Sequence, residues 1–167
     1  MIACNSTVLI FLSKLDKLSL LKELFKQVLI PEEVKREVVD EGKRKNHIDA
    51  IETEKAINEG WIKVENTEIH PLLMDIGIDK GEAEAISLAY KKKLGVLLDQ
   101  THAREAAKLL VVGPKGTLYV LLLALKKRLI SYDDYMLSLF DLIQFGFRMS
   151  EGVYLEAVRL GKELAKK

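Results

Sequence analysis

The segment Val96-Leu97-Leu98-Asp99-Gln100-Thr101 joins a continuous apolar run to a polar cluster. An uninterrupted apolar run of this kind is typical of a strand that is buried on both faces of a parallel sheet. The chain opens in the same way, because Ile2-Ala3-Cys4 is followed by Asn5-Ser6-Thr7. Further extended runs are predicted at three places: residues 28–30, 61–64 and 111–112. The sequence therefore predicts a set of short strands, most of them buried.

Apolar residues at helical spacing fill the intervals between these runs. The predicted helices cover residues 9–25, 31–42, 47–59, 79–94, 101–110 and 117–128. Pro31 suits the first turn of the second helix, and Glu32 and Glu33 favour its positive end. The alternation of short strands with helices predicts right-handed βαβ units. We therefore expect a three-layer α/β/α sandwich around a central parallel sheet of four or five strands.

Length and organisation favour one domain. The chain has 167 residues, which is enough to bury a hydrophobic core without disulfides or a structural metal. No linker rich in Pro, Gly or Ser divides it. Two more helices are predicted after Ser131, near residues 133–145 and 150–166. We expect residues 1–167 to form one domain, with residues 132–167 as a helical C-terminal appendage.

Composition excludes several classes of protein. The chain has 26 Lys and Arg against 25 Asp and Glu, so it does not bind nucleic acid through bulk charge alone. Cys4 is the only cysteine, which excludes an internal disulfide framework and a cysteine-rich zinc site. We see no signal-peptide pattern, and the longest apolar stretch, residues 118–125, is too short to span a bilayer. These features predict a cytoplasmic protein with no membrane partner.

Polar residues after the strands indicate where chemistry takes place. In open parallel sheets, ligands bind beyond the carboxyl ends of the strands, where Asn5 and Asp99 are expected. Glu37 and Glu84, on the helices that follow, could join them. Clustered carboxylates repel one another unless a cation neutralises them, and oxygen ligands without His or Cys suit Mg²⁺ or Mn²⁺. Such a site typically acts on phosphate esters.

Four motifs resemble, in their order and spacing, those of the PIN-domain family. They are residues 2–10 (IACNSTVLI), 29–38 (LIPEEVKREV), 81–89 (GEAEAISLA) and 97–104 (LLDQTHAR). Gly116-Thr117-Leu118 and Gly146-Phe147-Arg148-Met149-Ser150 resemble in particular a branch of small prokaryotic PIN-like proteins. The resemblance extends over almost the whole chain.

This resemblance implies a metal-dependent endoribonuclease, and many relatives are the toxin of a toxin–antitoxin pair. Asn5, Glu37, Glu84 and Asp99 match the family's catalytic, metal-binding positions, and the implied cofactor is Mg²⁺ or Mn²⁺. Ser6 would orient one of these ligands without touching the metal. The implied partners are an RNA substrate, an antitoxin protein and a second copy of the chain in a homodimer.

Two positions depart from the family pattern. Asn5 stands where most members have Asp, and its amide oxygen can ligate Mg²⁺ but brings no charge. Gln100 stands where relatives often carry a second acid after Asp99. The site would then hold three carboxylates, and its activity could be weak, dependent on Mn²⁺, or lost. The alternative function is therefore a catalytically inactive PIN-like module that binds RNA or a protein.

The same residues also have structural interpretations. Glu37 could be a solvated surface residue, Asp99 could cap the helix that follows it, and Asn5 could stabilise a tight turn. The helix macrodipole explains Glu82, so no catalytic role is assigned to it. Lys115 could touch an RNA phosphate. A Rossmann-like binder of small molecules is disfavoured, because no glycine-rich loop follows the first strand.

Overall fold

The computed structural model describes all 167 residues and contains a five-stranded parallel sheet. The strands lie in the order β3 (Ile62–Glu65), β2 (Val28–Pro31), β1 (Ile2–Cys4), β4 (Val96–Leu97) and β5 (Pro114–Lys115). Ala3 in the central strand β1 pairs with Leu29 on one side and with Val96 on the other. Because all the strands are parallel, their carboxyl ends meet at one edge of the sheet.

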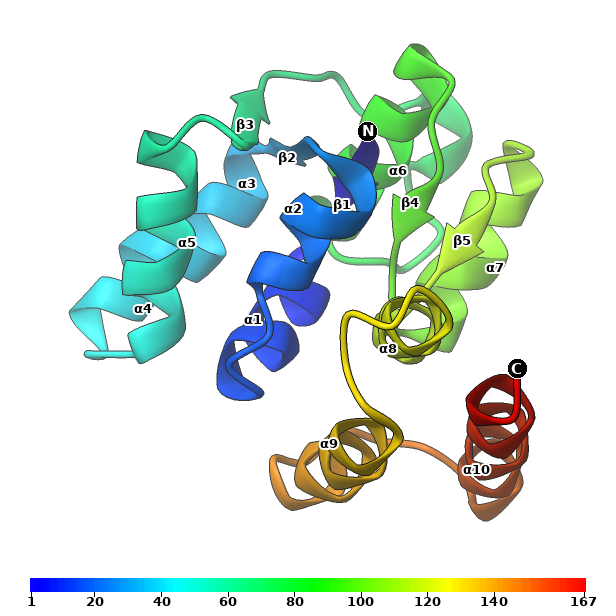
Figure 1. Ribbon diagram of the computed structural model, residues 1–167. Coiled ribbons are helices and arrows are strands. Elements are labelled where there is room, and N and C mark those ends of the chain that lie inside the picture. The colour runs from blue at the N-terminus through cyan, green and yellow to red at the C-terminus, as the bar shows by residue number, and fades with distance from the viewer.

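Helices surround this sheet and connect its strands (Figure 1). In chain order they are α1 (Ser6–Lys14), α2 (Ser19–Phe25), α3 (Glu32–Lys35), the π-helical turn η1 (Arg36–Asp40), α4 (Glu41–Arg44), α5 (Ile48–Asn58), the 3₁₀ turn η2 (Pro71–Leu73), α6 (Lys80–Lys92), α7 (Thr101–Leu109), α8 (Thr117–Lys126), α9 (Tyr132–Gln144) and α10 (Glu151–Ala165).

The side chains on the two faces of the sheet belong to two separate hydrophobic clusters, because successive side chains of a strand point to opposite faces. Ile2 and Cys4 of β1 belong to the larger cluster, which also takes residues from α1, α2, α5 and α8. Ala3 points the other way, into the cluster built with α6 and α7. The predicted three-layer α/β/α sandwich with a parallel sheet is thus confirmed.

The helix predicted over residues 9–25 is wrong in its extent. It begins earlier, at Ser6, and is interrupted between α1 and α2. Asp16 adopts a left-handed conformation with φ of 56°, and the backbone N–H of Lys17 donates to the carbonyl of Leu12 at 2.8 Å. This local turn ends α1, so two short helices replace the continuous one that the spacing of leucines predicts.

The strand predicted at Val111-Val112 is also wrong. Val111 has φ of 57° and is 92% exposed, while Val112 is buried in the second cluster. The edge strand β5 forms farther along, where Leu98 donates its backbone N–H to the carbonyl of Lys115 at 2.7 Å. The position of this strand is therefore determined by its pairing with β4 and could not be predicted from the local hydrophobicity of the sequence.

The helix predicted after Pro31 contains a π-helical turn. The segments α3, η1 and α4 follow one another without a break, and the π turn spans Arg36–Asp40. Within it Val38 and Val39 are both buried, while Glu37 is only partly exposed. Single π turns inside helices are frequent at functional sites, and this one carries a candidate ligand.

The C-terminal helices α9 and α10 pack against α8 (Figure 1). Their residues Tyr135, Leu139, Leu142 and Ala157 belong to the larger hydrophobic cluster. The Tyr135 hydroxyl donates to the carbonyl of Ala157 at 2.7 Å. The apolar helix α8 buries Val120, Leu121, Ala124 and Leu125, so half of the 118–125 stretch lies in the core.

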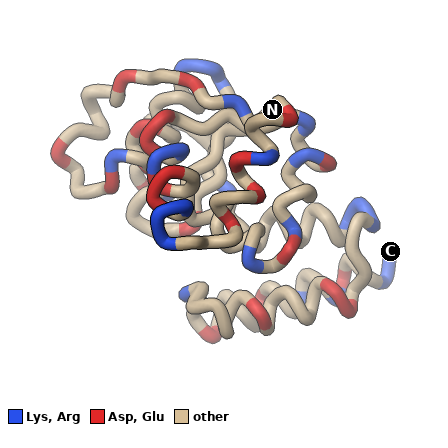
Figure 2. The backbone as a smooth tube through the Cα atoms, turned by 90° about the vertical axis from the view of Figure 1, so that its left-hand side faces the viewer, with Lys and Arg blue, Asp and Glu red and all other residues tan.

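Positive and negative residues are both scattered along the backbone tube in the view of Figure 2. This distribution agrees with the formal net charge of +1. None of the helices combines the length and the apolar character that crossing a membrane requires. Any attraction for a charged ligand must therefore come from a local group of side chains.

We expect Gly161→Ala to destabilise the protein, because the added Cβ would lie 2.4 Å from Cε1 of the buried Tyr135 ring. Overpacking of this kind costs about 1–3 kcal/mol. The matched control is Gly152→Ala in the same helix, where the nearest atom would be 4.0 Å away. Alanine should stabilise that position by about 0.5–1 kcal/mol. Urea unfolding of both variants measures the two effects, and equal changes would contradict the packing described here.

Candidate functional site

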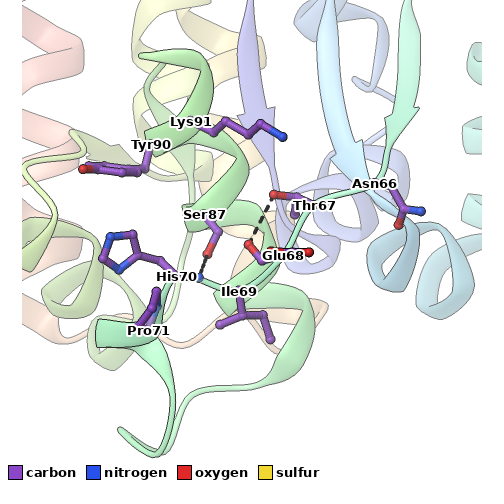
Figure 3. Close-up of a pocket in the computed structure, with 9 residues that line it drawn as sticks. All are labelled: Asn66, Thr67, Glu68, Ile69, His70, Pro71, Ser87, Tyr90 and Lys91. Atoms are coloured by element: carbon purple, nitrogen blue, oxygen red, sulfur yellow. Dashed lines mark hydrogen bonds between the residues drawn. The ribbon is translucent and has the colours of Figure 1, made fainter.

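A hollow of about 690 Å³ runs along α6 and the segment after β3 (Figure 3). It is lined in part by Asn66, His70, Ser87 and Tyr90. Ser87 accepts a hydrogen bond from the backbone N–H of His70 at 2.8 Å, and the His70 and Tyr90 rings meet edge to face at 4.9 Å. None of the predicted site residues lines this hollow. We therefore look for the site at the carboxyl edge of the sheet.

Asn5 lies at that edge, where β1 passes into α1. It is 2% exposed, and its backbone N–H donates to the carbonyl of Leu97 at 3.2 Å. Its side-chain oxygen accepts a hydrogen bond from the backbone N–H of Thr7 at 2.9 Å and so caps α1. The amide of Asn5 thus has a structural role in the helix N-terminus, as its residue type favours.

Glu37 approaches the same region from the π-helical turn. Its carboxylate accepts a hydrogen bond from the hydroxyl of Ser6, the residue that follows Asn5. Burial raises the pKa of Glu37, the Ser6 hydroxyl lowers it, and the nearby Glu33 carboxylate raises it again. The Ser6 hydroxyl thus contacts this carboxylate, and its predicted role in orienting a metal ligand stays a prediction.

Gly81 in the first turn of α6 leaves room for the Glu37 carboxylate. A Cβ at this position would lie 3.0 Å from Oε1 and 3.2 Å from Oε2 of Glu37. The acidic side chain therefore reaches the N-terminal end of α6, where the helix macrodipole favours negative charge. Glycine allows this close approach, because a Cβ here would require the carboxylate to shift by a few tenths of an ångström.

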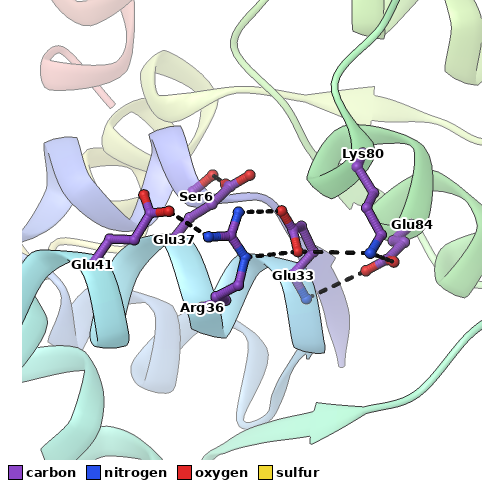
Figure 4. Close-up of polar contacts among 7 residues, drawn as sticks. All are labelled: Ser6, Glu33, Arg36, Glu37, Glu41, Lys80 and Glu84. Carbon is purple, nitrogen blue, oxygen red and sulfur yellow. Dashed lines mark hydrogen bonds and ion pairs between the residues drawn. The ribbon is translucent and has the colours of Figure 1, made fainter.

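Glu84 lies on α6 one turn beyond Lys80 and joins a network of charges (Figure 4). It is buried, and it accepts a hydrogen bond at 3.3 Å from the backbone N–H of Glu33 in the first turn of α3. Lys80 lies 3.8 Å from both the Glu84 and the Glu33 carboxylates, and Arg36 pairs with Glu33 and Glu41. These cations offset the repulsion between acids that face one another.

Asp99 follows β4 and is held by a residue eighteen positions farther along the chain. Oδ1 accepts the backbone N–H of Thr117 and Oδ2 accepts its hydroxyl, both at 2.7 Å. Burial raises the pKa of Asp99, and the two Thr117 hydrogen bonds and the charge of Arg104 partly oppose that effect. Asp99 therefore interacts with the N-terminus of α8, and the alternative prediction that it caps the following helix α7 is wrong.

The structure brings Ser6 and Glu37 into contact but leaves Glu84 and Asp99 with partners of their own. No group of three or more His, Cys, Asp or Glu side chains lies close enough together to hold a metal ion. The donor chemistry nevertheless fits a hard divalent cation, because it consists of carboxylate and amide oxygens. Cys4 is no competing ligand, since burial raises the pKa of its thiol well above the usual range.

Glu82 is a neighbour of this site for which the sequence predicts a role at the N-terminus of the helix and no catalytic role. Its Oε2 accepts the backbone N–H of Asp79 at 3.1 Å and completes the capping box of α6. Its Oε1 is buried and has no hydrogen-bond partner. Burial raises the pKa of Glu82, and the Asp79 and Glu37 carboxylates raise it further. Glu82 thus caps α6 through one carboxylate oxygen and keeps the other buried without a partner.

This geometry defines a class of protein: a three-layer α/β/α fold with acidic and amide side chains at the carboxyl edge of a parallel sheet. Residues 1–163 match the DUF3368 family model, which is described as a PIN domain. The chain therefore belongs to the PIN-domain family, as the four sequence motifs predict, and members of this family are usually nucleases.

A solved structure supports the same fold. The chain is similar to a PilT N-terminus domain protein, SSO1118, from the hyperthermophilic archaeon Sulfolobus solfataricus P2. The two share 17% sequence identity with a TM-score of 0.50, over 72% of this chain and 90% of the other. At this identity the likeness concerns the fold alone. A comparison with curated proteins gives no match.

We expect Asp99→Asn to stabilise the folded protein at neutral pH. A carboxyl group whose pKa is raised by folding binds more protons in the folded state, so its contribution to stability falls as the pH rises above the ordinary value of 3.8. The uncharged amide avoids this loss and keeps an oxygen to accept the Thr117 N–H. The gain should be about 0.5–2 kcal/mol, the usual size of a stabilising substitution.

Chemical denaturation of both proteins between pH 3 and pH 8 measures this effect. The difference in the free energy of unfolding should vanish below the ordinary Asp pKa, where Asp99 is protonated in both states, and grow as the pH rises. A variant that is less stable than the parent protein at pH 7 would show that the Thr117 hydrogen bonds outweigh the cost of burying the charge.

Proposed function

We propose that the protein is a Mg²⁺- or Mn²⁺-dependent endoribonuclease that hydrolyses phosphodiester bonds in RNA. The family supports this proposal, because PIN domains typically bind RNA and generally use divalent metal ions. The observation that supports it is that each acid lies next to the carboxyl end of a strand: Glu37 bonds to Ser6 after β1, Glu84 bonds to the first turn after β2, and Asp99 follows β4. Three acidic side chains in this position suit a cation that works on a phosphate.

In this proposal Asn5, Glu37, Glu84 and Asp99 hold the cation, which supplies a hydroxide and stabilises the charge that develops on the phosphate. The Ser6 hydroxyl orients Glu37. Thr117 fixes the direction of Asp99 through its two hydrogen bonds. These contacts position the ligands, and a cation must compete with the existing partners of each carboxylate to draw them together.

We expect the protein to cut a fluorescent single-stranded RNA in Mn²⁺ or Mg²⁺ and to leave it intact in EDTA. Asp99→Asn and Glu37→Gln should each lower the rate by about a hundredfold or more, because each removes a charged ligand. The matched control is Glu23→Gln, since Glu23 is an exposed acid on α2 outside the site. Gel analysis of the products over time gives the rates.

Thermal unfolding at increasing Mn²⁺ concentrations measures metal binding independently of RNA cleavage. Cleavage that survives Asp99→Asn would assign the activity to a contaminant and contradict the proposed site. Folded protein that neither cuts RNA nor gains stability from Mn²⁺ would contradict the enzymatic proposal. Loss of Mn²⁺ stabilisation in both site variants, but not in Glu23→Gln, would support the ligand assignment independently of activity.

Gly81→Ala should lower the cleavage rate while all the acidic residues remain in place. The added Cβ would lie 3.0 Å from Oε1 of Glu37 and displace its carboxylate. Because the carboxylate has to shift by only a few tenths of an ångström, the loss in rate should be smaller than the roughly hundredfold that a misplacement of about 1 Å can cause. Gly113→Ala is the matched control, because the added Cβ would meet no atom within 4 Å and Gly113 precedes β5 at the opposite edge of the sheet. Equal rates for both variants would remove Glu37 from the proposed site.

The second candidate is a catalytically inactive PIN-like module that binds RNA or a protein. It is favoured by Asn5, whose uncharged oxygen already caps α1, and by carboxylates that have partners without any cation. Binding of RNA in EDTA together with absent Mn²⁺ stabilisation would identify it. We regard it as secondary because the family is usually nucleolytic.

The remaining expectations stay proposals. The toxin role, the antitoxin and the homodimer would each require a protein surface, and the exposed apolar residues of α9, Leu137, Phe140 and Ile143, are available for such a contact. We also propose that residues 1–167 form one domain. We propose a cytoplasmic location because the single cysteine is free and buried.

A further inference from the structure

The segment of residues 146–150, between α9 and α10, borders the proposed active site. Hollows of about 620 and 550 Å³ lie beside Asp99, and both are lined by Asp99, Thr101, Phe147 and Arg148. They therefore adjoin one another and form a groove that passes the candidate catalytic carboxylate. We refer to these two hollows together as the Asp99 groove.

A set of contacts holds this segment in place against the fold. The Phe147 ring meets the Phe11 ring of α1 edge to face, with 5.1 Å between their centroids. The backbone N–H of Phe147 donates to the carbonyl of Leu142 at 2.9 Å, and Gly146 adopts φ of +88° to allow this turn. The next residue, Arg148, is exposed and lines both hollows.

The Asp99 groove has an excess of positive charge. One of its hollows is lined by Arg104, Lys115 and Arg148, and Asp99 is the one carboxylate beside them. None of these three cations takes part in an ion pair with a protein acid. Arg104 is anchored by its bond to the carbonyl of Leu98 at 3.1 Å. Lys115 and Arg148 are exposed, and exposed ammonium and guanidinium groups without an ion-pair partner are suited to phosphate oxygens.

Aromatic rings lie among these cations. Tyr119 lines the same hollow and is 37% exposed. The Lys115 ammonium lies over its ring, 5.0 Å from the centroid. Alternating cations and aromatic faces bind single-stranded nucleic acid, because phosphates meet the charges and unpaired bases can stack. A duplex keeps its bases stacked inside and cannot offer them to such rings.

We propose that Arg148, in the segment between α9 and α10, binds a backbone phosphate of the RNA that lies in the Asp99 groove, next to the bond that is cut. Arg148 is a positioning residue in this proposal, because it contacts the RNA backbone and does not bind the metal. The inference rests on the proposed function, which supplies RNA as the substrate. It gives the C-terminal appendage a direct part in substrate binding.

The test is binding of a fluorescent single-stranded RNA to the full chain in EDTA, measured by anisotropy at several salt concentrations. Arg148→Gln should raise the Kd by about tenfold and reduce the salt dependence of log Kd by about 0.7, the loss of one phosphate contact on a single strand. Arg148→Lys should restore most of both. The matched control is Arg44→Gln, because Arg44 is an exposed arginine on α4 without an ion pair.

In the cleavage assay, Arg148→Gln should raise KM with little change in kcat. Equal affinities for Arg148→Gln and Arg44→Gln, or tighter binding of a blunt RNA duplex than of the single strand, would overturn the inference. Asp99-dependent cleavage with no effect of Arg148→Gln would leave the nuclease standing and the groove assignment wrong. Arg148-dependent binding by a protein that never cuts RNA would support the groove and contradict the nuclease.

Discussion

The buried carboxylate of Asp99 accepts two hydrogen bonds from Thr117, and this contact ties the end of β4 to the start of α8. Gly116 lies so close to the same carboxylate that a Cβ there would be 2.8 Å from Oδ1. The contact fixes where α8 begins, and α8 in turn supports both C-terminal helices. A charged group at this depth costs stability, so the structure keeps an ionisable residue where an apolar or amide residue would pack more favourably.

The other acids show the same conflict between stability and chemistry. Glu84 bonds to the first turn of α3, Glu37 reaches the first turn of α6, and Asn5 caps α1. The bonds of Asn5 and Glu84 satisfy backbone N–H groups at helix N-termini, and helix caps contribute about 0.5–2 kcal/mol. Because parallel βα connections aim these N-termini at one edge of the sheet, the same residues that cap helices are gathered where a phosphate and a cation would bind. The side chains at this edge of the sheet are therefore placed both to cap helices and to bind a cation.

Most of the fold could be predicted from local pattern. The buried strands β1, β2 and β4 are short apolar runs, and α6 begins at Asp79-Lys80 as its capping residues indicate. Two predictions failed for reasons that hydrophobic periodicity does not encode. The left-handed turn at Asp16 divides the first predicted helix, and pairing with β4 determines where β5 forms. Whether Asn5, Glu37, Glu84 and Asp99 bind a metal stays a prediction. Their partners, such as Thr117 for Asp99, come from residues far away in the sequence, so no local motif could identify them.

The C-terminal helices are the part of the chain whose purpose was least visible in the sequence. Their packing is specific, since Gly161 leaves space for the ring of Tyr135 and the Tyr135 hydroxyl bonds to Ala157. This packing determines where the turn at Gly146 emerges, and the contact between Phe147 and Phe11 brings that turn to the sheet edge. A helical pair that served only to cover α8 would not need its connecting segment placed beside Asp99. The placement of Arg148 there gives the appendage a reason to be rigid, because a phosphate-binding cation is useful only at a fixed distance from the reacting bond.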